Sequence, residues 1–258
     1  MNPNTHRKVL TIIAFIATFS LTACAGLPGL GGTSWKEEVL LHDGRKIIVE
    51  RTLERGGRHE IGQRSGATKE TLAFTMPGTN QTITWNDPYS EDIGSSNFNP
   101  LMLEIANGSA YLVASPMGCL SYNKWGRPNP PYVVFNYQGT AWSRIPLAEL
   151  PAELTAPNLV ISSPDNAAEK ASGGVISAET IKQLNGRARR AESKAIVRGA
   201  IDNTADRCGE MVRTKNGGWL GIGWFKDQPT RETCLDYCER QEVSAKYCPC
   251  GTLFKDAK

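Results

Sequence analysis

Four short turn signals divide the middle of the chain into paired segments, and they constrain the possible folds more than any other feature. Asp-Gly and Asn-Gly supply the positive φ angles that two-residue hairpin turns require. The signals are Asp43 with Gly44, Pro77 with Gly78, Asn107 with Gly108, and Gln138 with Gly139. The sequence therefore predicts four β-hairpins, over residues 39–50, 72–85, 101–115 and 132–145.

Polar and apolar side chains alternate along these segments, which is typical of an antiparallel sheet with one buried face. Four hairpins supply about eight strands, and this number suits a sandwich or a partly closed barrel. We therefore expect residues 35–160 to form a β-rich domain. Within it, five residues illustrate the alternation: Leu101, Leu103 and Ile105 are predicted on one face of a strand, and Met102 and Glu104 on the other.

Residues 161–258 have a different character, because helix signals replace the strand pattern. Ser177 is a suitable N-cap for a helix that ends near Gly186, and Thr230 caps a second helix that reaches Gln241. Between them, residues 219–225 alternate glycine with large apolar side chains, which predicts a core strand. The chain is thus predicted to be mainly β with a smaller α part, an α+β fold whose helical C-terminal extension packs on the β-rich domain.

The first residues have the pattern of an export signal. A short basic start, residues 6–8, precedes an uncharged run of 13 residues, 9–21. A membrane-spanning helix needs about 20 apolar residues, so this shorter run indicates a signal peptide rather than a span. Residues 21–24, Leu-Thr-Ala-Cys, resemble the lipobox of bacterial lipoproteins.

The lipobox resemblance implies cleavage before Cys24, diacylglycerol on its sulfur, and acylation of the new amino terminus by a chain such as palmitate. Residues 1–23 are then the signal peptide and residues 24–34 a lipidated, glycine-rich tether. Ala25 stands where an aspartate would resemble an inner-membrane retention signal. We therefore expect a protein lipid-anchored to the outer membrane, with its body in the periplasm or at the cell surface. Ordinary secretion, with Cys24 left as a thiol, is the alternative.

The charge balance argues against a nucleic-acid partner. The net charge is +3, and loss of Arg7 and Lys8 with the signal peptide leaves 27 basic against 26 acidic residues. Nucleic-acid binding needs a concentrated cationic surface, which a nearly neutral chain does not provide. Residues 187–198 nevertheless carry five cationic side chains, which predict a solvated helix face or, alternatively, contact with anionic lipid.

The cysteines are the most informative residues of the mature chain. Six remain beyond Cys24, and an even number in an oxidising compartment predicts disulfides. Cys234 and Cys238 lie on one face of the predicted second helix, with a rise of about 6 Å between them. Cys248 and Cys250 lie on one face of an extended Cys-Pro-Cys segment, about 6.7 Å apart. The distance between the two cysteines is therefore similar in the two segments.

A reversal of the chain at about residues 243–246 would place these two pairs in an antiparallel ladder, and two cysteines are left to join the tail to the β region. The predicted disulfides are therefore Cys234–Cys250, Cys238–Cys248 and Cys119–Cys208. A Cys₄ zinc site and a redox site are the alternatives. Structural zinc favours C-x-x-C knuckles, and redox cysteines favour C-x-x-C at a helix start, so we expect no metal.

A proline-rich loop, residues 122–132, is the first candidate for ligand recognition. Pro128, Pro130 and Pro131 exclude a helix or a central strand there. The loop is either a recognition surface or a stiff connection whose aromatic side chains cover the end of the sheet. The candidate ligand surface consists of Trp85, Tyr89, Trp125 and Arg127.

The sequence holds little catalytic chemistry. The mature chain has two histidines, His42 and His59, and both are expected to be solvent-exposed in loops. No G-x-S-x-G, H-E-x-x-H or Walker sequence occurs. Carboxylate pairs beside aromatic rings are typical of glycan cleavage, and three carboxylates follow Trp85: Asp87, Glu91 and Asp92. A periplasmic glycan hydrolase that uses such a pair is therefore the alternative function.

The mature sequence is similar to a family of uncharacterised proteobacterial envelope lipoproteins, above all in residues 122–132, residues 146–160 and the cysteine-rich tail. The resemblance implies compartment and architecture, and it implies no activity. We therefore predict a non-enzymatic binding or structural component of the envelope. Its expected partners are the membrane, through the lipid anchor, and an envelope protein or a glycan. No cofactor is expected.

Overall fold

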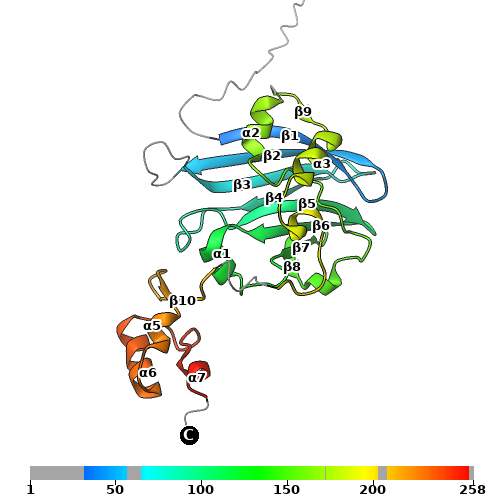
Figure 1. The fold of residues 1–258 in the computed structure, drawn as a ribbon. Helices are drawn as coiled ribbons and strands as arrows, with labels where there is room; N and C mark the ends of the chain where they lie inside the picture. The colour runs from blue at the N-terminus through cyan, green and yellow to red at the C-terminus, as the bar shows by residue number, and fades with distance from the viewer. Residues whose placement is uncertain (1–31, 57–64, 172, 203–207, 256–258) are drawn as a thin grey trace, which may run out of the picture. The chain divides into compact units, whose positions relative to one another are not determined.

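The computed structural model describes residues 32–56, 65–171, 173–202 and 208–255, so the signal peptide, Cys24 and His59 lie outside it. Nine strands form two larger sheets in the described ranges (Figure 1). The first sheet holds β1 (Gly32–Leu40), β2 (Lys46–Gly56), β3 (Gly66–Thr75), β4 (Thr82–Asp87) and β9 (Val175–Ile176), in the order β4-β3-β2-β1-β9. The second holds β5 (Phe98–Ala106), β6 (Ser109–Pro116), β7 (Val133–Tyr137) and β8 (Trp142–Ile145), in chain order.

All four predicted hairpins are present. Each turn signal joins two antiparallel neighbours, β1 to β2, β3 to β4, β5 to β6 and β7 to β8. Gly44 and Gly108 have φ angles of 86° and 76°, which a residue with a side chain rarely adopts. Strand β1 begins at Gly32, so residues 32–34, which were expected in the tether, pair with β2.

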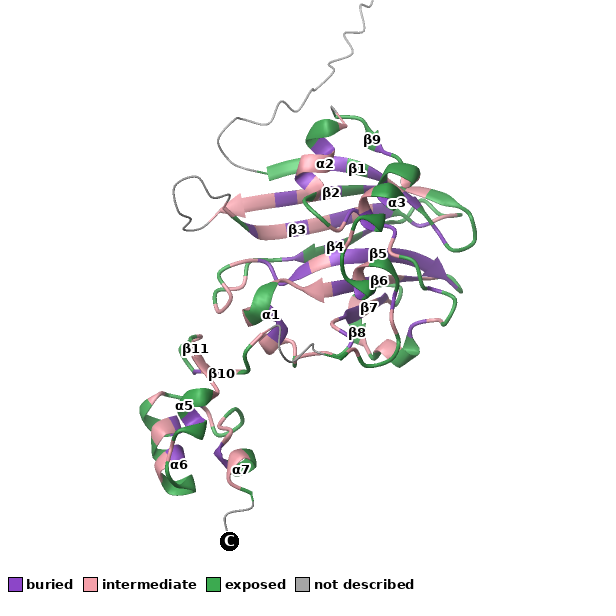
Figure 2. Cartoon of the chain, in the orientation of Figure 1, coloured by how far each residue is buried: buried purple, intermediate pink, exposed green. Residues whose placement is uncertain are grey.

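The main hydrophobic core lies between the two sheets. Val39, Leu72 and Trp85 of the first sheet are in one buried cluster with Leu103 and Leu112 of the second. Figure 2 shows buried residues along the strands of both sheets. The prediction of a mainly β fold with a smaller α part is confirmed, and the β part is an antiparallel sandwich rather than a closed barrel.

Side-chain hydrogen bonds tie the edges of the two sheets together. Asn158 Nδ2 donates to the carbonyl oxygens of Leu40 in β1 and Leu103 in β5, at 3.1 and 2.8 Å. At another edge, Trp142 Nε1 of β8 donates to the Thr84 carbonyl of β4 at 3.0 Å. Backbone groups that the sheet ladders leave unpaired are thereby satisfied.

Strand β5 does not have the single buried face that its alternation predicts. Leu103 belongs to the core between the sheets, whereas Leu101 lies in a second cluster with Met102 on the other face. The cause is a register shift between Pro100 and Met102, because an extra residue in one strand turns the side chains before it to the opposite face. The second face is buried as well, since residues 150–154 and Ile196 cover it.

The helices fall into two groups, and none in the described residues is both long and apolar enough to cross a membrane. Near the β sandwich they are α1 (Gly118–Lys124), η1 (Leu147–Glu149), α2 (Pro164–Lys170), α3 (Ala178–Gly186) and α4 (Ala191–Lys194). Ile181 of α3 and Ala168 of α2 share a buried cluster with Trp35 of β1. As predicted, the Ser177 side chain caps α3 by accepting from the Thr180 amide.

Residues 208–255 have a core of their own and form what we call the cysteine-rich module. It contains β10 (Met211–Arg213), β11 (Trp219–Gly221), α5 (Gly223–Lys226), α6 (Arg231–Arg240) and α7 (Cys250–Leu253). Thr230 caps α6 as predicted. The strand predicted over residues 219–225 ends at Gly221, because Phe225 reaches the module's core from helix α5 instead.

A charged network lies on the buried face of the first sheet. Arg51 of β2 is 1% exposed, and its guanidinium lies between Glu37 of β1 and Glu70 of β3. Arg51 also donates to the carbonyl oxygen of Val160 at 2.9 Å, and Glu37 accepts from the Val160 amide at 3.0 Å. The network therefore joins three neighbouring strands to a segment more than a hundred residues further along the chain.

We predict that Arg51→Met lowers the free energy of unfolding by about 3 to 5 kcal/mol, because it leaves Glu37 and Glu70 buried without their cation. Urea unfolding followed by tryptophan fluorescence measures the change. The matched control is Arg45→Met in the adjacent turn, where the side chain is 50% exposed and, among the described residues, forms its ion pair with Asp43. An Arg51→Met protein as stable as this control would contradict the structural role of the network.

Candidate functional site

Three disulfides link the described cysteines. Cys119 joins Cys208 with a Cα–Cα distance of 5.2 Å, and the other two are Cys234–Cys250 and Cys238–Cys248, at 5.7 and 5.9 Å. These are the three pairs predicted from the sequence. The antiparallel ladder gave two of them, and the two remaining cysteines gave the third. One premise of the ladder was wrong, because Pro249 is helical, with φ −83° and ψ −5°, rather than extended.

The sulfur atoms of the cysteine-rich module lie close together. Cys250 Sγ is 3.5 Å from Cys238 Sγ and 3.4 Å from Cys248 Sγ, so two disulfides are in contact. Three of these sulfurs fall within 4.8 Å of one another, a spacing that could suit a metal ion. Zinc binds thiolates, however, and sulfurs joined in disulfides are not thiolates. The site therefore acts as a covalent clamp.

The four residues predicted to form a ligand surface do not come together as one. Trp85 is 4% exposed and lies in the sandwich core, because the alternation of β4 turns it inward. Trp125 packs its ring against Phe98, with ring centroids 4.7 Å apart. Arg127 donates to the carbonyl oxygens of residues 208 and 209, and Tyr89 is 51% exposed. The aromatic side chains of the proline-rich loop thus close the end of the sandwich.

Two of the three carboxylates considered for glycan cleavage have structural partners, and the third, Glu91, is exposed. Asp87 is 2% exposed and accepts from the amides of Asn97 and Phe98, at 2.7 Å each. Burial raises its pKa to about 6 although these hydrogen bonds oppose the change. Asp92 forms ion pairs with Lys124 and with Arg213 of the cysteine-rich module, at 2.9 and 3.0 Å. Both side chains hold the end of the sandwich in place.

The basic run of residues 187–198 is solvated, as predicted, since its five cationic residues are all exposed, but they do not share one helix face. It contains only one short helix, α4, of four residues. Arg198 donates to the carbonyl oxygens of four residues, of which Leu150 and Pro151 are the nearest, at 2.8 and 2.7 Å. A single cationic side chain therefore satisfies four carbonyl oxygens of residues 147–154, of which only the first three form a helical turn.

His42 is exposed in the β1–β2 turn, as predicted, but its ring has a partner that the sequence did not indicate. Its Nδ1 lies 3.0 Å from Glu104 Oε2, and the Glu104 side chain is only 4% exposed. Burial raises the pKa of Glu104, whereas the hydrogen bonds from His42 lower it. The pair connects the β1–β2 turn to β5 across 62 residues of sequence. No local pattern in the sequence could have revealed it.

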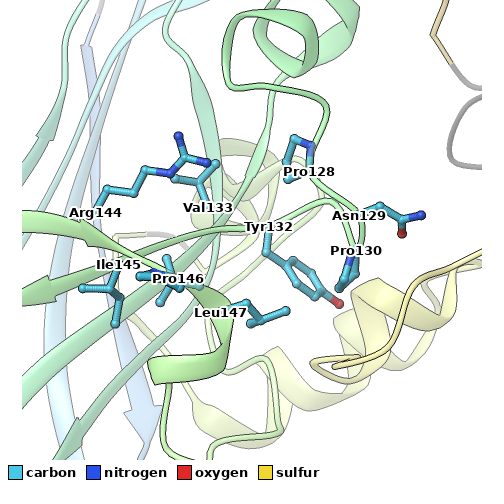
Figure 3. A pocket seen from close by; sticks show the side chains of 10 residues that line it. Pro128, Asn129, Pro130, Tyr132, Val133, Arg144, Ile145, Pro146 and Leu147 are labelled. Atoms are coloured by element: carbon cyan, nitrogen blue, oxygen red, sulfur yellow. The ribbon is translucent and has the colours of Figure 1, made fainter.

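Figure 3 shows one hollow, of about 420 Å³, between the proline-rich loop and strand β8. Pro128 and Pro130 lie on one side, and Arg144 lies on the other. Tyr132 points its hydroxyl toward the segment around α4, where it donates to the Glu192 carbonyl. Arg144 contacts the ring and the carbonyl oxygen of Trp125. The polar groups here already have partners within the protein.

A different hollow, of about 320 Å³, lies beside Glu70, and we call it the Glu70 hollow. It lies where β2 and β3 approach the start of β5. Its lining includes Arg51, Arg55, Glu70, Asn99, Met117 and Ser163. A neighbouring hollow, of about 400 Å³, shares Asn99 and Ile161 with the Glu70 hollow and extends toward the Cys119–Cys208 disulfide.

The backbone is irregular on several sides of the Glu70 hollow. One register shift, between Glu54 and Arg55, interrupts the β2–β3 pairing, and the other, at Pro100, interrupts the β5–β6 pairing. Ser163 adopts φ 48°, which is uncommon for a residue with a side chain. Bulges are frequent beside functional sites because they redirect side chains, so these features single out this end of the sandwich.

The polar groups of the Glu70 hollow differ in how well they are satisfied. Both oxygens of Glu37 accept hydrogen bonds, from Trp35 Nε1, Arg51 and the Val160 amide. The hydrogen bonds described for Glu70 all come from Arg51 and all go to Oε1. Burial raises the pKa of Glu70 even though Arg51 opposes the change. Nothing in the sequence distinguishes Glu70, because β3 alternates polar and apolar residues like any half-buried strand.

Comparisons with protein-family models, with curated proteins and with solved structures found no match to this chain.

We predict that the protein becomes less stable as the pH rises from 4.5 to 7.5. Asp87 has a pKa of about 6 in the folded state, above its ordinary 3.8. Its contribution to stability is therefore complete below pH 3.8 and is lost as the pH rises through 6. The expected loss is about 1 to 3 kcal/mol, measured by urea unfolding at each pH. Glu70 and Glu104 shift in the same direction.

In the Asp87→Asn variant this pH dependence should be smaller. The exposed neighbouring side chain offers a matched control, since Glu91→Gln should leave the dependence as it is in the parent protein. Equal pH slopes for Asp87→Asn and the parent would show that the Asp87 carboxyl does not titrate as described.

We also predict that iodoacetamide modifies none of the six cysteines from Cys119 to Cys250 unless a reductant is added first. Mass spectrometry of the denatured protein, before and after reduction, counts the modified residues. The mass increase after reduction should correspond to six additional alkyl groups. Four free thiols in the unreduced protein would contradict the disulfides of the cysteine-rich module.

Proposed function

We propose that the protein is a lipoprotein anchored to the outer membrane of a bacterial cell, with its body in the periplasm or at the cell surface, and that it acts by binding rather than by catalysis. The observation that carries the proposal is the use of its seven cysteines. Six are paired in disulfides, which persist in oxidising compartments outside the cytoplasm. The seventh, Cys24, is in the lipobox-like sequence.

Lipidation at Cys24 would give a nearly permanent anchor. Each CH₂ group of an acyl chain that enters the bilayer contributes about 0.8 kcal/mol, and a diacylglycerol group with a further acyl chain such as palmitate supplies several chains. A polypeptide anchored in this way needs no membrane-spanning helix. Beyond the anchor, the proposed partner is an envelope protein or a glycan.

Binding is favoured over catalysis because two of the carboxylates proposed as catalytic make structural contacts. Asp87 holds the start of β5 through backbone amides, and Asp92 holds the cysteine-rich module through Arg213. Paired carboxylates that cleave glycans must be open to a substrate between them. The hydrolase therefore remains an alternative without a supporting contact, whereas the Glu70 hollow offers polar groups to a ligand.

We predict that the full-length chain, produced in a Gram-negative host that is fed radiolabelled palmitate, becomes labelled and sediments with the outer-membrane fraction. Cys24→Ser should abolish the label and the membrane association, because the acceptor sulfur is missing. Cys119→Ser is the matched control, since it removes another cysteine and should keep the label. Membrane sedimentation of the unlabelled Cys24→Ser chain would contradict the lipid anchor.

A further inference from the structure

We propose that the Glu70 hollow binds a protonated amine carried on a short aliphatic stem. The inference deepens the binding function proposed above and takes its biological setting from it. Its physical basis is separate, because it depends on the charges and contacts of the β sandwich and on nothing at the N-terminus.

The first step is the charge of the buried network. Two carboxylates, Glu37 and Glu70, share the single cation of Arg51, and all three side chains are at most 3% exposed. One negative charge is therefore left without a partner in a buried site, which is costly unless a proton or a cation neutralises it.

The second step locates this charge on Glu70. Glu37 accepts hydrogen bonds at both oxygens, so its charge is well satisfied. Glu70 receives Arg51 at Oε1 only, and in the part of the chain that the structure describes no donor reaches Oε2. The Glu70 side chain is 3% exposed and lines the hollow, so a nearly buried carboxylate with one oxygen free of described donors borders the ligand space.

The third step considers the other charges near Glu70. Arg55 is the second cation of the hollow, but its guanidinium donates to Asp165 at 3.0 Å and to the Ser65 carbonyl at 2.9 Å. Asp87 lies opposite Glu70 on β4 and adds a further negative charge. The electrostatic field at the hollow thus favours a cation.

The fourth step concerns the walls, which select the type of cation. Beside its polar groups, the lining of the Glu70 hollow includes apolar side chains, among them Leu53, Ala67, Pro100 and Met117. A divalent metal ion requires about six oxygen ligands, which one carboxylate oxygen does not supply. An ammonium group needs few acceptors, and its aliphatic stem can pack on the apolar wall. Asn99, at the rim, adds an amide oxygen as a further acceptor.

Titration of the full-length protein in non-ionic detergent with n-pentylammonium chloride at pH 8, followed by isothermal calorimetry, tests the proposal. We expect saturable binding with one site per chain. The uncharged analogue 1-pentanol should bind at least about tenfold more weakly, because it lacks the charge that Glu70 recognises. Equal affinity for the two compounds, or no binding of the amine, would overturn the proposal.

Variants locate the bound amine. Glu70→Gln should weaken binding by about tenfold or more, whereas Glu50→Gln, on the opposite face of the same sheet, should leave the affinity unchanged. If Glu70→Gln fails to fold, Asn99→Leu serves instead, because the Asn99 side chain has no described hydrogen bond to lose. It should weaken binding by about threefold. Unchanged affinity in a folded Glu70→Gln or Asn99→Leu protein would overturn the site.

The proposed function can fail independently of this inference. Absence of palmitate on Cys24 would refute the anchor and leave the amine titration as it is. Absence of amine binding would refute the ligand class and leave the lipid anchor untouched.

Discussion

The contact of Arg51 with Glu37, Glu70 and Val160 is the constraint on which the rest of the structure depends. A guanidinium offers several donors in one plane, so a single side chain can hold two carboxylates and a carbonyl oxygen. Arg51 connects neighbouring strands of the first sheet to residue 160, which follows the second sheet in the chain. The position of the segment that leads into α2 is therefore set by hydrogen bonds as well as by apolar packing.

Polar side chains also join separate elements elsewhere in the structure. Asn158 bridges β1 and β5, Arg198 satisfies the irregular backbone after η1, and Asp87 holds the amides at the start of β5. Buried backbone groups need partners, and polar side chains supply them where no strand is adjacent. A cluster of polar residues in this sequence therefore indicates a connection between structural elements more often than a catalytic site. Glu70 differs, because one of its oxygens has no donor among the described residues.

Local chemistry made much of the fold predictable. The turns at Gly44 and Gly108 require positive φ angles, and a two-residue turn fixes which segments pair. The caps Ser177 and Thr230 were recognisable because capping involves residues only three positions apart. The disulfides of the cysteine-rich module followed from short spans, and they form although Pro249 is helical rather than extended. Interactions within about twenty residues carried these predictions.

Long-range geometry decided the rest. Neighbours in the chain specify the hairpins, the helix caps, the mainly β class and the two disulfides of the cysteine-rich module, whereas Cys119 and Cys208, 89 residues apart, were paired by elimination. Tertiary packing places Trp85 in the core, brings His42 to Glu104, and makes Glu70 part of the lining of a hollow. These outcomes depend on which faces of two sheets meet and on bulges that shift them, and a single residue of register reverses the direction of every side chain that precedes it.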